Sequence, residues 1–147
     1  MKFKVLSRKL AEEYSKNSNK DKSIIISIKS TNDTSTPDIQ CTKTNNIKSI
    51  LSLVFDDVET QYLENEKPIS NEQAQEIVDF VNKWYKNIDL IIVHCDAGIS
   101  RSAGICAALS KWLINDDTPY FNGYSYIPNM VCYRKVLNIA MGELNYD

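Results

Sequence analysis

The sequence lacks a long apolar run. None of its 147 residues belong to a stretch approaching the roughly 20 consecutive apolar residues that a membrane-spanning helix requires. The first six residues, MKFKVL, interleave lysines with apolar side chains and are not the apolar core of a secretory signal. We therefore expect a cytoplasmic protein with no membrane partner, whose mature chain begins at or near Met1.

Paired cysteines are also missing. The single histidine is not placed to complete a zinc site, and no two cysteines have C-x-x-C spacing. With no export signal, this pattern predicts free thiols in a reducing compartment. Because free cysteines are among the most buried residue types, we interpret three of them as core or surface filler. These three are Cys41, Cys106 and Cys132.

Neither sign of charge dominates. Seventeen basic and nineteen acidic residues give a net charge of −2, without a long run of either sign. Binding to a nucleic-acid backbone needs a basic face, so nucleic acid is a poor candidate partner. The hydrophobic fraction of 43% and charged fraction of 24% are ordinary for a soluble globular protein. The chain length fits a single domain covering residues 1–147.

Strand and helix patterns alternate along the chain. Alternating, β-branched and continuous apolar runs predict strands at 2–6, 23–29, 47–55 and 88–93. Helical spacing and capping residues predict helices at 8–15, 70–87, 103–114 and after Asn129. Loops are predicted at 31–46 and 119–128. This order predicts an α/β fold, a single domain with a mostly parallel central sheet flanked by helices.

The helical patterns also predict which faces are buried. Leu10, Ala11 and Tyr14 share a face of the first helix. The second carries Ala74, Ile77, Val78, Val81 and Tyr85 at helical spacing. The last carries a stripe of Met130, Tyr133, Leu137, Ala140 and Leu144. The aromatic side chains of Tyr120, Phe121, Tyr124 and Tyr126 are expected to pack over the sheet rather than border a cleft.

The segment at 91–104, IIVHCDAGISRSAG, leads from an apolar strand into a helix. Ligands of α/β sheets bind at this edge, and helix N-termini present backbone N–H groups to anions. Between Cys95 and Arg101 there is enough chain to curl those groups around a phosphoryl group, and Gly98 suits a bend with positive φ. The Arg101 guanidinium matches two phosphate oxygens. The residues of this cradle are Asp96, Ala97, Gly98, Ile99, Ser100 and Arg101.

The same positive surroundings favour a thiolate at Cys95. A free cysteine has a pKa of about 8.5, which a helix N-terminus and nearby cations lower to roughly 3.5–7.5. Cys95 is thus predicted to be a nucleophile, with Ser102 assisting the sulfur when it leaves. His94 is expected to support the loop through hydrogen bonds rather than act as a base. A buried structural cysteine is the alternative, but it would not need Gly98, Arg101 and Ser102 at these offsets.

Residues 94–102, HCDAGISRS, resemble the H-C-x-x-G-x-x-R-S signature of cysteine-dependent protein tyrosine phosphatases. The chain length and the Arg-Ser ending are most similar to the compact dual-specificity branch. A looser resemblance extends from about residue 24 to 144 and includes IPN at 127–129. It implies a two-step reaction without a metal or cofactor. The thiolate attacks phosphorus while an Asp protonates the leaving oxygen, and water then hydrolyses the phosphocysteine with that Asp as base.

The resemblance places the acid in the segment LVFDDVET at 53–60. Asp57 is preferred, because family loops commonly run hydrophobic residue, variable residue, Asp. Asp56 is the alternative acid, because a slip of one residue exchanges the two. Both are also compatible with a simple turn at the end of a strand.

The expected partner is a phosphoprotein or phosphopeptide, with phosphotyrosine first and phosphoserine and phosphothreonine as further candidates. Asp96 disfavours polyanionic inositol lipids, whose phosphatases often carry lysines in this loop. RNA 5′-triphosphatases with related loops usually have Thr after the arginine, where this sequence has Ser102. The alternatives are a phosphatase for a phosphoinositide or RNA 5′-phosphate and a non-catalytic phosphate- or phosphopeptide-binding module. Arsenate reduction or sulfur transfer is a further alternative, with Cys41 or Cys106 as partner thiol in the former.

Overall fold

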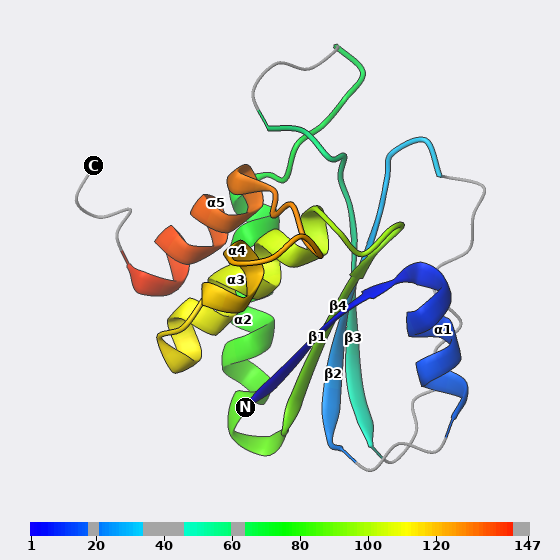
Figure 1. Cartoon of the computed structure of the whole chain (residues 1–147), viewed down its shortest axis with the longest axis vertical. Coiled ribbons are helices and arrows are strands. Elements are labelled where there is room, and N and C mark those ends of the chain that lie inside the picture. Colours follow the sequence, from blue (N-terminus) through cyan, green and yellow to red (C-terminus); the bar gives the residue numbers. More distant parts are fainter. Residues whose placement is uncertain (18–20, 34–45, 60–63, 143–147) are drawn as a thin grey trace.

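The computed structural model describes residues 1–17, 21–33, 46–59 and 64–142. In these residues, four parallel strands form one sheet in the order β1-β4-β2-β3 (Figure 1). The strands are β1 (Lys2–Ser7), β2 (Ser23–Lys29), β3 (Ile47–Val54) and β4 (Leu90–Cys95). Strands and helices alternate along the chain, as the sequence indicates, and the predicted α/β fold with its parallel sheet is confirmed.

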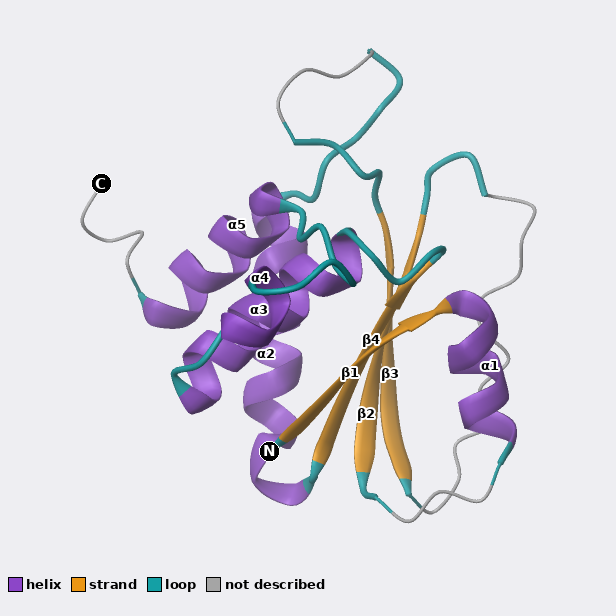
Figure 2. Cartoon of the chain, in the orientation of Figure 1, coloured by secondary structure: helices purple, strands orange, loops and turns teal. Residues whose placement is uncertain are grey.

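Helices cover both faces of this sheet (Figure 2). Helix α1 (Arg8–Lys16) packs on one face, where Ile25 of β2 and Ile92 of β4 are fully buried. The opposite face carries α2 (Asn71–Trp84), α3 (Arg101–Ile114) and α5 (Met130–Met141), together with the short α4 (Thr118–Phe121). Because side chains alternate along a strand, Ile24 and Ile26 belong to this second, larger core. The two inner strands are therefore buried on both faces and mostly apolar, with Ser27 and His94 among their buried polar residues.

Strand β4 begins two residues later than the predicted run at 88–93 and extends to Cys95. The reason is its pairing: the ladder with β1 starts at Lys2 opposite Leu90 and continues to Ser7 opposite Cys95. A 3-10 turn, η1 (Tyr85–Asn87), precedes it. The extension carries Cys95 to the carboxyl end of the sheet, where α3 begins after a short loop.

The buried face of α1 agrees with the predicted one at Ala11 and at Tyr14, which packs against the core, but not at Leu10. Ala11 and Ser15 are buried, whereas Leu10 is 51% exposed. Two small residues four positions apart let the helix approach the sheet closely, and Leu10 lies about 100° around the helix from Ala11. In α2, by contrast, four of the predicted apolar residues are buried, and Ser70 and Gln73 form the predicted capping box. The fifth, Tyr85, is partly buried and follows the helix, which ends at Trp84.

The two long C-terminal helices differ from the predicted ones in the start of α3 and in the most deeply buried residues of α5. Helix α3 begins at Arg101, before the predicted start at 103, because the N–H of Gly104 already bonds to Ser100 O at 2.9 Å. In α5, Cys132 and Val136 are fully buried, since this helix packs against both α2 and α3. Tyr133, Leu137 and Ala140 of the predicted stripe are partly buried against the same core. Leu144 of the predicted stripe lies outside the described residues.

The predicted loop at 119–128 contains the helical turn α4, and Pro119 occupies its first turn. Its aromatic residues do not pack over the sheet as predicted: Tyr124 is fully exposed, and the other three make ring contacts near the helices. The ring centroids of Tyr120 and Tyr126 are 5.8 Å apart, and Phe121 lies edge-on to Tyr133 of α5 at 5.4 Å. Most of the predicted loop at 31–46, with Cys41, lies outside the described residues. No helix in the described ranges is both long and apolar enough to cross a bilayer.

Candidate active site

A pocket of about 370 Å³ opens at the carboxyl edge of the sheet, where β4 passes into α3. Residues from three segments far apart in the sequence form its walls. They are Asp57, Cys95, Asp96, Ala97, Ile99, Ser100, Arg101 and Ile127. The structure thus brings the preferred acid, the cysteine and the arginine of the sequence analysis into one cavity.

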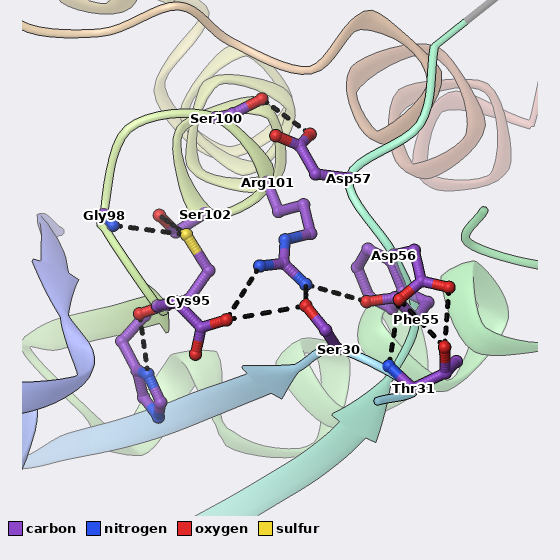
Figure 3. A network of polar contacts seen from close by, with 12 residues as sticks. Ser30, Thr31, Phe55, Asp56, Asp57, Cys95, Gly98, Ser100, Arg101 and Ser102 are labelled. Carbon is purple, nitrogen blue, oxygen red and sulfur yellow. Dashed lines mark hydrogen bonds and ion pairs between the residues drawn. The ribbon is translucent and has the colours of Figure 1, made fainter. Parts of the chain in front are cut away.

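The loop between Cys95 and Arg101 turns sharply at Gly98, whose φ is +72°. A side chain would be strained there, and a Cβ would lie 2.6 Å from backbone atoms of Leu6 and Ser7 at the end of β1. The backbone N–H of Gly98 donates to Cys95 Sγ at 3.3 Å (Figure 3). The loop therefore curls around the sulfur and presents its backbone to the pocket, as the sequence predicts for this glycine.

The Cys95 thiol is held in surroundings that favour its charged form. Burial raises its pKa, but this effect is outweighed by the hydroxyl and backbone N–H of Ser102, the N–H of Gly98 and the charge of Arg101. The net pKa is below the ordinary value for a cysteine. The Ser102 hydroxyl oxygen lies 3.1 Å from the sulfur. This arrangement favours the thiolate form of Cys95.

Arg101 is only 6% exposed, yet it lines the pocket. Its Nη1 donates to Ser30 Oγ at 2.9 Å and to the carbonyl of Phe55 at 2.8 Å, and its Nη2 pairs with Asp96 Oδ2 at 3.4 Å. These contacts hold its plane between the ends of β2 and β3, beside the cysteine (Figure 3). The sequence analysis did not identify Ser30 and Phe55. Their positions at the carboxyl ends of two predicted strands could have placed them at this edge of the sheet.

The two candidate acids face in different directions (Figure 3). The Asp56 carboxylate accepts hydrogen bonds from the N–H and hydroxyl of Thr31 and from the N–H of Lys67 at 2.8–2.9 Å. Burial raises the pKa of Asp56, but these bonds outweigh it and lower the pKa overall. Asp57 instead lines the pocket, where its Oδ1 accepts a hydrogen bond from Ser100 Oγ at 2.8 Å.

His94 lies behind the loop and is fully buried. Its Nδ1 lies 3.3 Å from the carbonyl of Cys95 and its Nε2 lies 2.6 Å from Ser27 Oγ on β2. Burial lowers the pKa of His94, so the ring is neutral at neutral pH. A neutral ring satisfies both contacts when Nδ1 donates to the carbonyl and Nε2 accepts from the hydroxyl.

The catalytic-domain model of the dual specificity phosphatases matches residues 9–118 of the chain. The chain belongs to this family. The phosphatase signature that the sequence resembles is thereby confirmed, and the family supports phosphatase activity in general and a phosphorylated substrate. No curated protein matches the sequence.

Two solved structures show that this dual-specificity phosphatase domain has the fold of its relatives. The human tyrosine phosphatase-like serine/threonine/tyrosine-interacting protein aligns with a TM-score of 0.56 and 17% identity, over 83% of this chain and 78% of that one. PTPMT1 aligns with a TM-score of 0.54 and 13% identity, over 99% and 96% of the respective chains. At these identities the likeness concerns the fold.

The sequence analysis of this phosphatase domain missed Ile127, which lines the pocket, and the contact of Asn129 with Asp57 behind it. Ile127, from the segment before α5, is 72% exposed and its N–H donates to the carbonyl of Ile99 at 3.0 Å. With Ile99, which is 42% exposed, it forms an apolar rim beside the loop. Asn129, interpreted only as a helix cap, donates from Nδ2 to Asp57 Oδ1 at 2.8 Å. The IPN triplet was the available signal for both.

The other described cysteines do not line this pocket. Cys106 and Cys132 are buried free thiols, and burial raises the pKa of each. Cys106 therefore lacks the position that a partner thiol for arsenate reduction needs, and Cys41 lies outside the described residues. Among the residues that the structure describes, no three His, Cys, Asp or Glu side chains are grouped to hold a metal ion.

Proposed function

We propose that this protein hydrolyses phosphate monoesters on phosphoproteins through a phosphocysteine intermediate, without a metal. Phosphotyrosine is the first candidate substrate, and phosphoserine and phosphothreonine are further candidates. The observation that carries the proposal is that Cys95, Arg101 and Asp57 line one pocket, in which hydrogen bonds and a positive charge lower the pKa of the thiol.

In the first step the Cys95 thiolate attacks phosphorus while the backbone amides of residues 96–101 and the Arg101 guanidinium bind the phosphoryl oxygens. The bond from phosphorus to the ester oxygen breaks, and Asp57 gives that oxygen its proton. In the second step Asp57 accepts a proton from water, whose oxygen attacks phosphorus. The thiolate then leaves with a hydrogen bond from the Ser102 hydroxyl, and inorganic phosphate is released.

Asp57 is the proposed acid and base because it borders the cavity that contains Cys95. The Asp56 carboxylate is occupied by Thr31 and Lys67, so its proposed role is to fix the segment that carries Asp57. His94 is proposed to support the loop, since its neutral ring bridges the Cys95 carbonyl and β2.

Two features of the pocket support a phosphoprotein substrate. The side chains of Ile99 and Ile127 offer apolar surface at the mouth, which suits a phenyl ring better than a polyol head group. Asp96 adds negative charge beside Arg101, which disfavours a ligand with several phosphates. Phosphotyrosine carries an aromatic ring and a single phosphate.

We also propose that residues 1–147 form one phosphatase domain in the reducing cytoplasm. The matched region, 9–118, omits β1 and α5, yet β1 pairs with β4 and α5 packs on α2 and α3. Both elements therefore complete the structure around the site. A reducing compartment is consistent with the three free thiols of the described residues and keeps Cys95 available for attack.

The test is turnover of para-nitrophenyl phosphate with EDTA and a reductant, followed by phosphotyrosine, phosphoserine and phosphoinositide substrates. Wild type should be active and Cys95→Ser inactive. Asp57→Asn should lose about 10²- to 10⁴-fold on phosphotyrosine peptide, and Asp56→Asn should lose much less. Wild type that is folded and inactive but binds phosphopeptide would replace the enzyme proposal with the binding module. Selective turnover of the lipid would replace the substrate class.

A further inference from the structure

Asn129 connects the segments that build the active site. Its side chain is fully buried at the N-cap of α5, where Oδ1 accepts a hydrogen bond from the N–H of Cys132 at 3.0 Å. Its Nδ2 donates to Asp57 Oδ1 at 2.8 Å and to the carbonyl of Val58 at 3.2 Å. Its backbone N–H bonds to the carbonyl of Ser100 at 2.9 Å. One residue thus joins the acid segment, the phosphate loop and α5.

Two side-chain donors of the described residues contact the same oxygen of the Asp57 carboxylate. Ser100 Oγ and Asn129 Nδ2 each lie 2.8 Å from Oδ1. A carboxylate oxygen has two lone-pair positions, so these two donors occupy Oδ1 fully. The proton that the carboxyl group exchanges during the reaction is then carried by Oδ2. The two donors therefore decide which oxygen of Asp57 is available to the substrate.

We propose that Asn129 is a positioning residue for the reaction: with Ser100 it orients the Asp57 carboxyl group so that Oδ2 exchanges the proton with the leaving oxygen. This inference rests on the proposed function, in which Asp57 is the acid. Asn129 touches neither the thiol nor the phosphoryl group in that mechanism. Its effect on the rate passes through Asp57.

Capping alone does not require asparagine at this position. Serine and aspartate cap helices about as well, but neither provides an N–H₂ group that reaches the acid segment. The position itself is constrained by α3, because a Cβ on Gly104 would lie 2.4 Å from the carbonyl oxygen of Asn129. The close contact between α3 and α5 holds the donor where Asp57 needs it.

The decisive variant is Asn129→Ser, which retains a capping oxygen and lacks a donor long enough to reach Asp57. A general acid matters most when the leaving group is poor, so the decrease in rate caused by Asn129→Ser should be larger for more basic leaving oxygens. We expect kcat/KM to fall about tenfold for phenyl phosphate and phosphotyrosine peptide, and less than about twofold for para-nitrophenyl phosphate. The KM for each substrate and the affinity for vanadate should stay close to wild type.

A double-mutant cycle with Asp57→Asn separates positioning from a general structural effect. If Asn129 acts through Asp57, Asn129→Ser should cause no further loss in the Asp57→Asn background. Equal losses for all leaving groups, or additive losses in the cycle, would overturn the proposal. If Asn129→Ser does not fold, Ser100→Ala gives the same test, because it removes the other donor to the same oxygen.

The matched control is Ser70→Ala at the N-cap of α2, where Ser70 Oγ accepts from Gln73 N in the same way. It should lower the midpoint of urea denaturation and leave the dependence on the leaving group unchanged. The Asp57→Asn variant also separates a failure of the proposed function from a failure of the positioning role of Asn129. If it retains full activity on poor leaving groups, the acid assignment fails and this proposal fails with it. If Asp57→Asn loses activity while Asn129→Ser and Ser100→Ala do not, the positioning role of Asn129 is overturned and the proposed function remains.

Discussion

At the scale of the residue, opposing effects act on the pKa of the Cys95 thiol. Burial works against the charge, and a set of short-range donors outweighs it. Ser102 contributes twice, through its hydroxyl and its backbone N–H, whereas Gly98 contributes one N–H. The reactivity of this cysteine therefore depends on a few specific contacts.

Replacing Ser102 by alanine should raise the pKa of Cys95, because the side-chain donor to the sulfur is lost while the backbone is unchanged. A hydrogen bond to a charged group contributes about 1.5–3 kcal/mol. The rate of iodoacetamide labelling at about pH 6 should therefore fall about tenfold or more in Ser102→Ala. Its profile against pH should move to higher pH, with mass spectrometry assigning the label to Cys95. An unchanged profile would exclude the hydroxyl as a source of thiolate stability.

The carboxylate of Asp96 places a negative charge next to the Arg101 guanidinium. Its carboxylate lies 3.4 Å from Arg101 Nη2 and is half exposed, while the arginine is buried. Asp96→Asn preserves the shape and removes the charge. We expect severalfold tighter inhibition by phosphate and vanadate, with a larger gain for substrates carrying several phosphates, because repulsion increases with ligand charge. Titration in buffers of matched ionic strength measures this, and equal or weaker binding would show that the ion pair serves only to hold Arg101.

At the scale of the element, the contact between α3 and α5 determines where the N-terminus of each helix lies. Gly104 allows the backbone of Asn129 to lie against α3. The same two helix N-termini carry Arg101 and the asparagine that contacts the acid segment. The packing of this pair of helices is therefore part of the geometry of the site.

Gly104→Ala should separate these helices, although alanine favours a helix over glycine by about 1 kcal/mol. The added Cβ meets backbone, which cannot turn away as a side chain does, so we expect a net loss of about 1–2 kcal/mol. Urea denaturation measures this. Gly123→Ala is the control, because its Cβ would meet an ordinary contact at 3.9 Å. A stabilised Gly104→Ala variant would mean that the helices move apart without cost.

At the scale of the whole molecule, the parallel sheet brings the carboxyl ends of β2, β3 and β4 to one edge. Across this edge His94 of β4 bonds to Ser27 of β2, with both side chains buried in the interior. The chain has a single histidine, so its titration can be separated from the rest. Its protonation state therefore links the stability of the fold to the loop that holds Cys95.

Stability should fall on acidification because of His94. Burial lowers its pKa from the ordinary value of 6.5, so below that pH the unfolded chain binds a proton that the folded chain excludes. The free energy of unfolding should then decrease by up to about 1.4 kcal/mol per pH unit, from 6.5 down to the lower pKa of the folded state. The effect of Asp56 lies at lower pH, since its pKa is below its ordinary value of 3.8.

Urea denaturation of wild type and His94→Asn at about pH 7.5 and pH 5.5 tests this. The variant is expected to be less stable at neutral pH and to lose less stability on acidification. The carboxylates titrate alike in both proteins, so the difference between their slopes of unfolding free energy against pH isolates the contribution of the histidine. Equal slopes would mean that His94 is already charged in the folded protein or accessible to water.

The fold and the phosphate loop could be predicted largely from sequence, because their determinants are local. The isoleucine-rich strand β2, the capping box of α2 and the turn at Gly98 each depend on residues a few positions apart. The helix faces were less predictable, as Leu10 shows, because burial there depends on which neighbour the helix packs against.

By itself the sequence determined the order of strands and helices and the contiguous loop that curls around Cys95, since neighbours along the chain specify their own backbone. Only the tertiary structure decided which of two adjacent aspartates faces the pocket. It also decided that Ser30, Phe55, Ile127 and Asn129 surround the site. These residues come from different strand ends and from the start of α5. They meet because the strands pair in the order β1-β4-β2-β3 and α5 packs on α3, and both depend on packing between distant segments.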